Sequence, residues 1–418
     1  MQQLLKKLSM AAALTLAFGS AHADAGIDTP GFHGYARVGA GTSSTHGPQS
    51  CFGLGGNTMK YRLGNECDSY LEGGYTGDFA TVEGVTYTGT VWFAAYKPNS
   101  NFGDANVEVA KAYVEAKGID FLKGGTAWVG KRYYMRPDIH MLDLQYINLN
   151  GTGAGINRVA LGPGHASYAF FKDNDANDID PNTGVVTNTS AAIRQNFIYE
   201  DIPVNLNGTL DVVATVITAQ GKADRHDGWQ VSLFHRQAKV MGGGNTFGVQ
   251  YGVGPGSGIG VGNARMGSSG STLSGSDVKR FRVFNDLAIQ PMTNFGMELV
   301  ALAQRDESDA GGSSTWTTLG VRPVYALHKN FKVALELGTD RVTSPNGGPA
   351  KRLTKITLAP SISAGPGLFD RPELRLYVSY GKWNDAATAS VNAANNSGPV
   401  YNNNTSGASA GFQVETWF

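Results

Sequence analysis

The segment 130–146, GKRYYMRPDIHMLDLQY, places ionisable side chains among apolar ones. Arg136, Asp138 and His140 fall on even positions, whereas Asp143 falls on an odd one. A half-buried strand keeps its polar residues at every second position, so this change of phase excludes one regular strand. Guanidinium and carboxylate groups make strong, charge-assisted hydrogen bonds with each other and with polar ligands. What they do here depends on the elements that hold the segment.

Catalysis and metal binding are two chemistries that such residue types could support. His33 and His140 could act as bases, but no spacing ties either of them to a nucleophile, so the sequence does not predict an enzyme. We interpret His140 as a structural residue. The acidic run DNDANDID at 173–180 lacks the glycine and terminal glutamate of an EF-hand loop. We interpret it as a solvated loop and expect neither a metal nor a cofactor.

The N-terminus indicates export. Residues 1–23 combine basic Lys6 and Lys7 with an apolar stretch and an Ala-His-Ala site, which predicts a secretory signal cleaved after residue 23. Cys51 and Cys67 are the only cysteines, and two thiols without a CxxC motif do not fill a zinc site. Because disulfides persist in exported proteins, we expect these two cysteines to pair.

The remaining chain, 24–418, is interpreted as a single domain. The whole sequence carries 34 Lys and Arg against 34 Asp and Glu, and loss of the signal removes two of the basic residues. This balance gives no basic excess to attract nucleic acid, so no nucleic-acid partner is expected.

Period-two alternation is the main secondary-structure signal. In the terminal stretch GFQVETWF, successive side chains alternate between a mainly apolar face and a second face that holds the polar residues. The stretches FHGYARV, FGVQYGV and ELRLYVSYG show the same alternation. Turn residues recur along the chain, and no stretch after the signal holds 18 consecutive apolar residues. These features favour an all-β fold, a transmembrane antiparallel barrel with lipid on its apolar face and water on its polar face. The length suits about 16–18 strands, enough for an aqueous channel. A final aromatic residue is typical of bacterial outer-membrane barrels.

Several motifs together resemble the maltoporin family of outer-membrane sugar channels. They are FHGYAR, KYRLGNEC, the segment 130–146 followed by GTGAG, and then DGW, TLGVRP, KITLA, DRPELR, YGKWND and the terminal TWF. The resemblance implies an 18-stranded antiparallel barrel, a homotrimer embedded in outer-membrane lipid, and a third loop folded inward to constrict the pore. The family binds oligosaccharides along a row of aromatic side chains, the greasy slide, and a track of charged groups. The physics is reasonable, because flat rings offer apolar area and charged groups bind hydroxyls strongly.

The resemblance assigns slide roles to a set of aromatic residues. They are Tyr35, Tyr70, Phe102, Phe369 and Trp417. Phe102 corresponds to a second-loop aromatic residue that, in the family, reaches into the neighbouring subunit. Phe369 occupies a position where the family has tryptophan. The alternative for Tyr35, Tyr70 and Trp417 is a girdle of aromatics that faces lipid. The five other tryptophans are interpreted as girdle or wall residues.

The resemblance also assigns a polar track. Its residues are Arg37, Arg62, Glu72, Lys111, Arg136, Asp138 and Asp143, with Lys111 in place of an arginine. The alternative is a structural charge network that would line any porin, in which the acidic residues mainly hold the arginines. Cys51 and Cys67 match the family's first-loop disulfide.

Three positions depart from the family pattern. Gln145 replaces the tyrosine of the constriction, Asn148 replaces an aspartate, and Gly244 replaces a slide phenylalanine near the periplasmic exit. These changes argue against an aromatic gate of the family type and, with it, against selectivity for maltodextrins. The sequence therefore predicts a passive channel for maltodextrin-like or other oligosaccharides. The alternative is a general diffusion porin without a sugar site, and a barrel hydrolase is the least favoured hypothesis.

Overall fold

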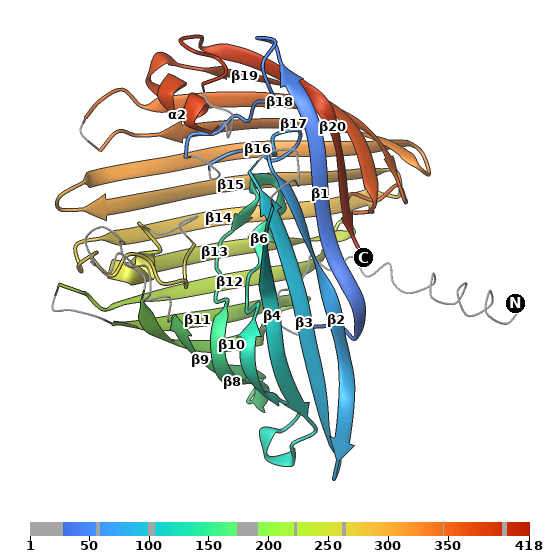
Figure 1. The fold of residues 1–418 in the computed structure, drawn as a ribbon, viewed down its shortest axis with the longest axis vertical. Helices are drawn as coiled ribbons and strands as arrows, with labels where there is room; N and C mark the ends of the chain where they lie inside the picture. The colour runs from blue at the N-terminus through green and yellow to red at the C-terminus, as the bar shows by residue number, and fades with distance from the viewer. Residues whose placement is uncertain are drawn as a thin grey trace, which may run out of the picture.

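A computed structural model describes most of the chain. The described residues are 28–55, 59–98, 105–173, 191–220, 224–260, 265–345, 347–394 and 399–418. Within them, 18 strands form one continuous antiparallel sheet that closes on itself (Figure 1). The predicted all-β barrel of about 18 strands is therefore confirmed.

The wall of the barrel consists of strands that follow one another around the ring. The first are β1 (Gly31–Ser43), β2 (Ser69–Val82), β3 (Val85–Lys97), β4 (Asn106–Lys117), β5 (Thr126–Arg132), β8 (Gly151–Leu161), β9 (Gly164–Asp173), β10 (Ala192–Asn205) and β11 (Gly208–Ala219). The others are β12 (Gly228–Val240), β13 (Gly243–Val253), β14 (Lys279–Met292), β15 (Phe295–Ser308), β16 (Gly312–His328), β17 (Phe331–Val342), β18 (Lys351–Ser363), β19 (Glu373–Trp383) and β20 (Ser406–Trp417).

Pairing of the first and last strands closes the ring. Strand β1 pairs with β2 on one side and with β20 on the other, and Tyr35 stands opposite Trp417. At the end of the barrel where β1 begins and β20 ends, the turns are mostly short. Glu83 and Gly84 join β2 to β3 with φ angles of 51° and 83°, which is typical of a tight type I′ hairpin. The connections at the opposite end are mostly longer, and we number them as loops from that end.

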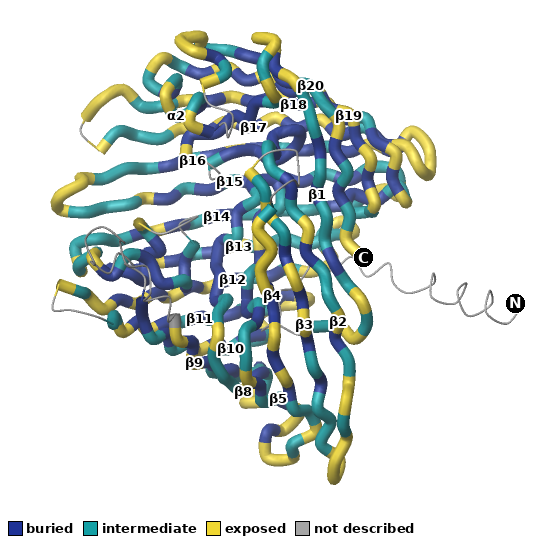
Figure 2. The backbone as a smooth tube through the Cα atoms, in the orientation of Figure 1, coloured by how far each residue is buried: buried dark blue, intermediate teal, exposed yellow. Residues whose placement is uncertain are grey.

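The alternation predicted from the sequence is present in the wall. Along β19, Leu374, Leu376 and Val378 are exposed on the outside, whereas Arg375 and Tyr377 between them are buried on the inside. Figure 2 shows the same alternation of buried and exposed residues along most strands. Apolar side chains thus cover the outer face and polar ones line the lumen, as a membrane barrel requires.

The third loop (133–150) leaves the wall and folds into the lumen. It contains a small hairpin of β6 (Asp138–Ile139) and β7 (Leu144–Gln145), joined by the 3₁₀ turn η3 (His140–Leu142). Ile139 and Met141 are fully buried, while Asp138 is exposed. The change of phase in the sequence falls at the η3 turn, inside a loop that has already left the wall after Arg132. The inward-folded loop is confirmed.

The first loop (44–68) also folds inward. Tyr61 is buried, and its ring lies over Gly320 and Gly338, where an added Cβ would come within 2.1 Å of ring atoms. The missing side chains of these two wall residues make room for the loop. Cys51 and Cys67 form a disulfide with their Cα atoms 6.0 Å apart, so the expected pairing is confirmed.

In the residues that the structure describes, helical structure is limited to short segments. They are η2 (Asp120–Leu122), η4 (Gly254–Ser257), η5 (Asp385–Ala387) and α2 (Thr388–Ala393) besides η3. Within the described ranges, no helix is long and apolar enough to cross a membrane.

Candidate translocation path

The third loop is held in place by the opposite wall. Gln250 on β13 and Arg282 on β14 both donate hydrogen bonds to the carbonyl of Tyr146, each at 3.0 Å. The Tyr146 ring packs against Phe234 and Phe284, with centroids 5.0 and 4.6 Å away. Because polar and apolar contacts fix the same residue, the loop is a rigid part of the lumen.

The first and third loops meet inside the barrel. The backbone N–H of Arg62 donates to the carbonyl of Met141 at 2.8 Å. The buried carboxylate of Glu66 accepts from Arg37 and from Arg62, both at 2.5 Å. Arg37 also pairs with Asp68 at 2.7 Å. Two predicted track residues, Arg37 and Arg62, thus belong to a network that ties the first loop to the wall.

Two predicted slide tyrosines lie side by side on the lumen face. The ring centroids of Tyr35 and Tyr70 are 6.0 Å apart, and both residues are partly exposed inside the barrel. The Tyr35 hydroxyl donates to Glu415 at 3.0 Å and also accepts from Arg62. The contacts of Tyr35 with Glu415 and with Arg62 of the first loop, and those of Tyr70 with Glu72 and Tyr133, turn both rings toward the interior of the barrel.

Phe369 and Trp417 come together near the end of the barrel that holds the chain termini. Phe369 lies in the turn between β18 and β19, and Trp417 is the last residue of β20. Both rings approach His140 of the third loop, with centroid distances of 5.6 and 6.4 Å. The Arg371 guanidinium lies 4.6 Å from the Trp417 ring centroid. These contacts place both aromatics on the lumen side.

Glu72 is already engaged by the protein. Its carboxylate accepts from the hydroxyls of Tyr70 and Tyr133, both at 2.7 Å, and from Arg136 at 3.0 Å. The Arg136 guanidinium also stacks on the Tyr133 ring at 3.6 Å. Glu72 therefore acts as an anchor for its neighbours, which is the structural role left open by the sequence.

Lys111 is engaged in a similar way. Its ammonium group pairs with Asp28 at 2.5 Å and lies 3.6 Å from the centroid of the Trp92 ring. Trp92 is buried on the lumen side, where it packs with Tyr70 and Tyr133. Trp92 and Tyr133 thus complete an aromatic and charged cluster that the sequence analysis did not identify. Trp92 could have been noticed, because it stands on the polar phase of β3.

Asp143 is an ionised residue of the third loop. Burial would raise the pKa of its carboxyl group, but Arg37, Arg62 and Lys60 outweigh burial and hold that pKa below its usual range. The carboxylate lies 3.6 Å from Arg37 and 3.9 Å from Lys60. Its charge is therefore largely balanced by the wall and the first loop, whereas Asp138 remains exposed to the lumen.

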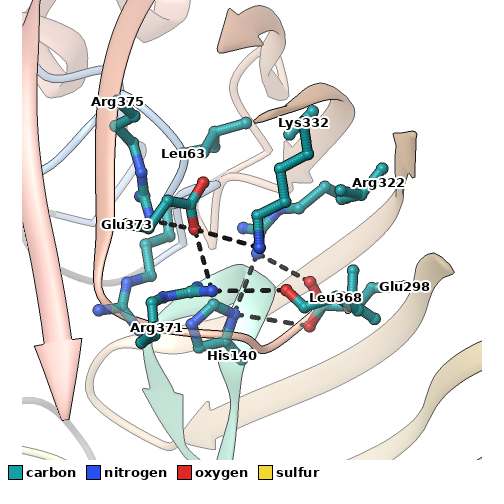
Figure 3. A pocket seen from close by; sticks show the side chains of 12 residues that line it. Leu63, His140, Glu298, Arg322, Lys332, Leu368, Arg371, Glu373 and Arg375 are labelled. Atoms are coloured by element: carbon teal, nitrogen blue, oxygen red, sulfur yellow. Dashed lines mark hydrogen bonds and ion pairs between the residues drawn. The ribbon is translucent and has the colours of Figure 1, made fainter. Parts of the chain in front are cut away.

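His140 stands at a charged pocket (Figure 3). Its Nδ1 atom is 3.0 Å from Arg322 Nη1 and 3.5 Å from Glu298 Oε1. Burial and Arg62 oppose protonation, but the carboxylates of Glu298 and Glu415 outweigh them and raise the pKa of His140. The imidazole thus connects the third loop electrostatically to the barrel wall.

The same pocket continues toward the β18–β19 turn. Figure 3 shows Lys332, Arg371 and Arg375 pointing toward Glu373. Glu373 lies 2.9 Å from Arg371 and 3.1 Å from Arg375. Alternating charges therefore line this part of the lumen. Such groups can exchange hydrogen bonds with a passing polar solute.

The departures from the family pattern also lie in or near the lumen. Gln145 pairs with Asp138 in the β6–β7 hairpin, and its side-chain oxygen accepts from Asn148 Nδ2 at 2.6 Å. Gly244 lies near the start of β13, opposite Ala288. The described third loop therefore presents two neutral amides where the resemblance expects a tyrosine and an aspartate. Phe102 lies outside the described residues.

Comparison with known proteins agrees with this architecture. The family model described as LamB porin matches residues 31–418. The structure of OccAB2 from Acinetobacter baumannii aligns with a TM-score of 0.51 at 9% identity, covering 94% of this chain and 99% of that one. An anion-selective porin from Comamonas acidovorans gives 0.44 at 9% identity, with coverage of 93% and 99%. The trimer form of OmpT from Vibrio cholerae gives 0.40 at 10%, with coverage of 94% and 100%.

The family match and the closed 18-stranded sheet agree on the kind of protein. The molecule is an integral β-barrel of the outer membrane, and its fold and family are those of a diffusion channel. The resemblance first noted in FHGYAR and in the 130–146 segment is confirmed across almost the whole chain. The chain belongs to the LamB porin family.

Proposed function

We propose that this channel carries oligosaccharides by facilitated, sugar-selective diffusion. The observation that supports this most directly is the pair of lumen tyrosines, Tyr35 and Tyr70, with rings 6.0 Å apart. Their spacing allows one sugar chain to contact both rings. Trp417, which stands opposite Tyr35 in the closing strand pair, and Phe369 offer further aromatic surface beside His140.

Charged groups accompany these rings. Arg62 and Glu415 flank Tyr35, and Arg371 stacks on Trp417. A sugar that slides from ring to ring would exchange hydrogen bonds with these groups. Transport requires several weak stations, because one deep binding site would trap the solute. The charged groups beside the rings are already bonded to other protein groups, so each binds a passing hydroxyl weakly. Weak binding at each position suits transport.

We propose a homotrimer as the working assembly, after maturation to residues 24–418. OmpT of Vibrio cholerae, a structure with a similar arrangement, is described in a trimer form. The outer face carries exposed Leu, Val and Phe side chains that suit outer-membrane lipid. Removal of residues 1–23 as an export signal is part of the same proposal.

A general diffusion porin is the second candidate. The neutral pair Gln145 and Asn148 favours it, because an aromatic gate is missing from the third loop. Current through single channels in planar bilayers separates the two functions. Sucrose, maltose, maltotriose and an unrelated sugar should each be added. Concentration-dependent block by at least one sugar supports selectivity, and absence of block by all of them supports the general porin.

A further inference from the structure

A row of basic side chains lies on the outer face of the wall, where β17, β18 and β19 run side by side (Figure 1). Arg341 on β17 and Arg352 on β18 stand directly opposite each other, and Lys382 on β19 stands opposite Thr354, two positions along β18 from Arg352. All three basic residues are exposed, whereas the residues on either side of them in the strands are buried or half-buried. Arg341, Arg352 and Lys382 therefore form one surface patch, which we call the basic patch.

The basic patch has few counter-charges. Side chains directly opposite each other in an antiparallel pair have their Cβ atoms about 5 Å apart, so the two guanidinium groups repel each other. In the described part of the chain, no carboxylate lies within 4 Å of the charged groups of Arg341, Arg352 or Lys382. The two adjoining loops, 343–350 and 384–405, contain Asp385 as their only acidic residue. The patch thus carries an excess of positive charge.

The outer face becomes apolar a short distance from the basic patch. Thr339 and Thr354 form the next outward pair, with their hydroxyl oxygens 3.3 Å apart. Leu337 and Ile356 form the pair after that, and both are exposed. Since a strand rises about 3.3 Å per residue, the step from Arg341 to Leu337 spans about 13 Å. A face that passes from cations through hydroxyls to apolar groups matches the headgroup, the interface and the acyl chains of a lipid.

The basic patch faces the outer leaflet of the membrane. It lies at the end of the barrel that carries the longer loops, since β17 ends and β18 begins there around the loop 343–350. Outer-membrane barrels place their longer loops outside the cell and their short turns in the periplasm. In a bacterial outer membrane, the outer leaflet is built from lipopolysaccharide, whose lipid A part carries phosphate groups on a sugar headgroup above its acyl chains. The lipid next to the patch is therefore anionic at the level of the arginines.

We propose that Arg341, Arg352 and Lys382 form a binding site for a phosphate group of lipid A, with the acyl chains of that lipid lying against Leu337 and Ile356. A guanidinium binds phosphate through two parallel, charge-assisted hydrogen bonds, and an ammonium group adds a point charge. A phosphate between Arg341 and Arg352 relieves the repulsion that their direct opposition creates. The site goes beyond the proposed sugar channel and is independent of it, because these side chains lie on the outer face of the wall.

Native mass spectrometry of the full-length mature channel in detergent, with divalent cations removed by a chelator, tests this site. The probes are diphosphoryl lipid A, the same lipid A after removal of both phosphates, and phosphatidylglycerol. The variants are Arg352→Gln, the double variant Arg341→Gln, Arg352→Gln, and the double variant Arg341→Lys, Arg352→Lys. Arg305→Gln is the matched control, because Arg305 is also an exposed, outward-facing arginine near the loop end but pairs with Glu307. Heat-dependent gel mobility and single-channel conductance confirm that each variant is folded.

The site predicts a specific pattern of binding. Diphosphoryl lipid A binds the unmodified channel more tightly than the dephosphorylated form does. The double glutamine variant weakens binding of diphosphoryl lipid A about tenfold and changes binding of the dephosphorylated form by less than about twofold. Arg352→Gln has a smaller effect in the same direction, and the double lysine variant, which keeps both charges, binds more tightly than the double glutamine variant. Arg305→Gln matches the unmodified channel.

Other results would overturn the assignment. Equal weakening of both forms of lipid A would show that the patch does not recognise the phosphate. Equal effects of Arg305→Gln and Arg352→Gln would show a general effect of surface charge. Binding of phosphatidylglycerol as tight as that of diphosphoryl lipid A would indicate a site for any anionic lipid. Loss of an oligomeric band in the double glutamine variant, with lipid binding unchanged, would show that the patch contacts a second copy of the chain instead. A channel that no sugar blocks would contradict only the proposed function.

Discussion

The imidazole ring of His140 stands perpendicular to the ring of Phe369, with centroids 5.6 Å apart and an interplanar angle of 90°. The contact joins the third loop to the turn between β18 and β19, two segments separated by more than half of the chain. Edge-to-face geometry places the positive edge of one ring against the negative face of the other. Glu298 and Glu415 lie within 4 Å of the imidazole. His140 is therefore the point at which pH can act on the third loop.

Raising the pH should loosen the third loop through His140. The pKa of His140 is raised above its usual value of 6.5, so folding favours proton binding at this residue. Its contribution to the free energy of unfolding is fully present below pH 6.5 and is lost as the pH rises through the raised pKa. We expect the thermal stability of the barrel to fall over that interval, and to fall less in His140→Gln. Thermal unfolding followed by gel mobility from pH 5.5 to 9 measures this. Parallel pH profiles of both proteins would contradict the role of His140.

Substitutions at Tyr35 separate ring stacking from hydrogen bonding. Tyr35→Phe keeps the ring and loses the bond to Glu415, which retains Arg371 at 3.0 Å and Arg375 at 2.6 Å. Tyr35→Ala also removes the aromatic surface, which contributes about 1 kcal/mol or more to a stacked contact. We expect Tyr35→Ala to weaken sugar binding by about tenfold and Tyr35→Phe to weaken it much less. Titration of current block gives both affinities.

The conductance of small ions serves as the control for Tyr35. It should stay nearly unchanged in both variants, because the wall and the loops remain. Trp417→Ala should behave like Tyr35→Ala, since Trp417 stands opposite Tyr35 in the closing strand pair. Loss of conductance together with loss of block would indicate a folding defect.

Removing the disulfide should release the first loop. Cys67 follows Glu66, whose carboxylate binds Arg37 and Arg62 at the junction with the third loop. A cross-link across 16 positions stabilises a fold by about 3 kcal/mol in the chain-entropy model. We expect the double variant Cys51→Ala, Cys67→Ala to unfold at lower urea concentration and to show noisier current. Reductant should reproduce this in the unmodified protein and leave the variant unaffected; a reductant effect on the variant would point elsewhere.

Local sequence pattern was sufficient for the wall and insufficient for the lumen. Alternation along β19 and β20 reflects only neighbours in sequence and the two solvents on either side, so it can be read from the chain. The inward path of the first loop depends on Gly320 and Gly338, more than 250 positions from Tyr61. Nothing near Tyr61 signals that pairing. The resemblance indicated an inward third loop, but not the partners that hold it.

The same reason explains the residues that were missed. Trp92 stands on the polar phase of β3, but its place in the cluster depends on Lys111, which stands opposite it on β4. The alternation along one strand does not show which residue of the next strand stands opposite. For Arg37 and Glu72, the pattern and the resemblance indicated that the side chains reach the lumen. They did not indicate that these side chains are already bonded to other protein groups.

Replacing Gln145 with tyrosine tests whether this position lines the narrowest part of the channel. The side chain of Gln145 is half-buried in the β6–β7 hairpin and bonded to Asn148 at 2.6 Å. A phenol ring is larger and cannot make the same amide contact, so it should extend into the lumen. We expect Gln145→Tyr to lower single-channel conductance and to strengthen block by maltotriose. Asn148→Asp is the control, since it adds charge without adding bulk and should change ion selectivity more than conductance. Unchanged or increased conductance in Gln145→Tyr would show that Gln145 lies away from the constriction.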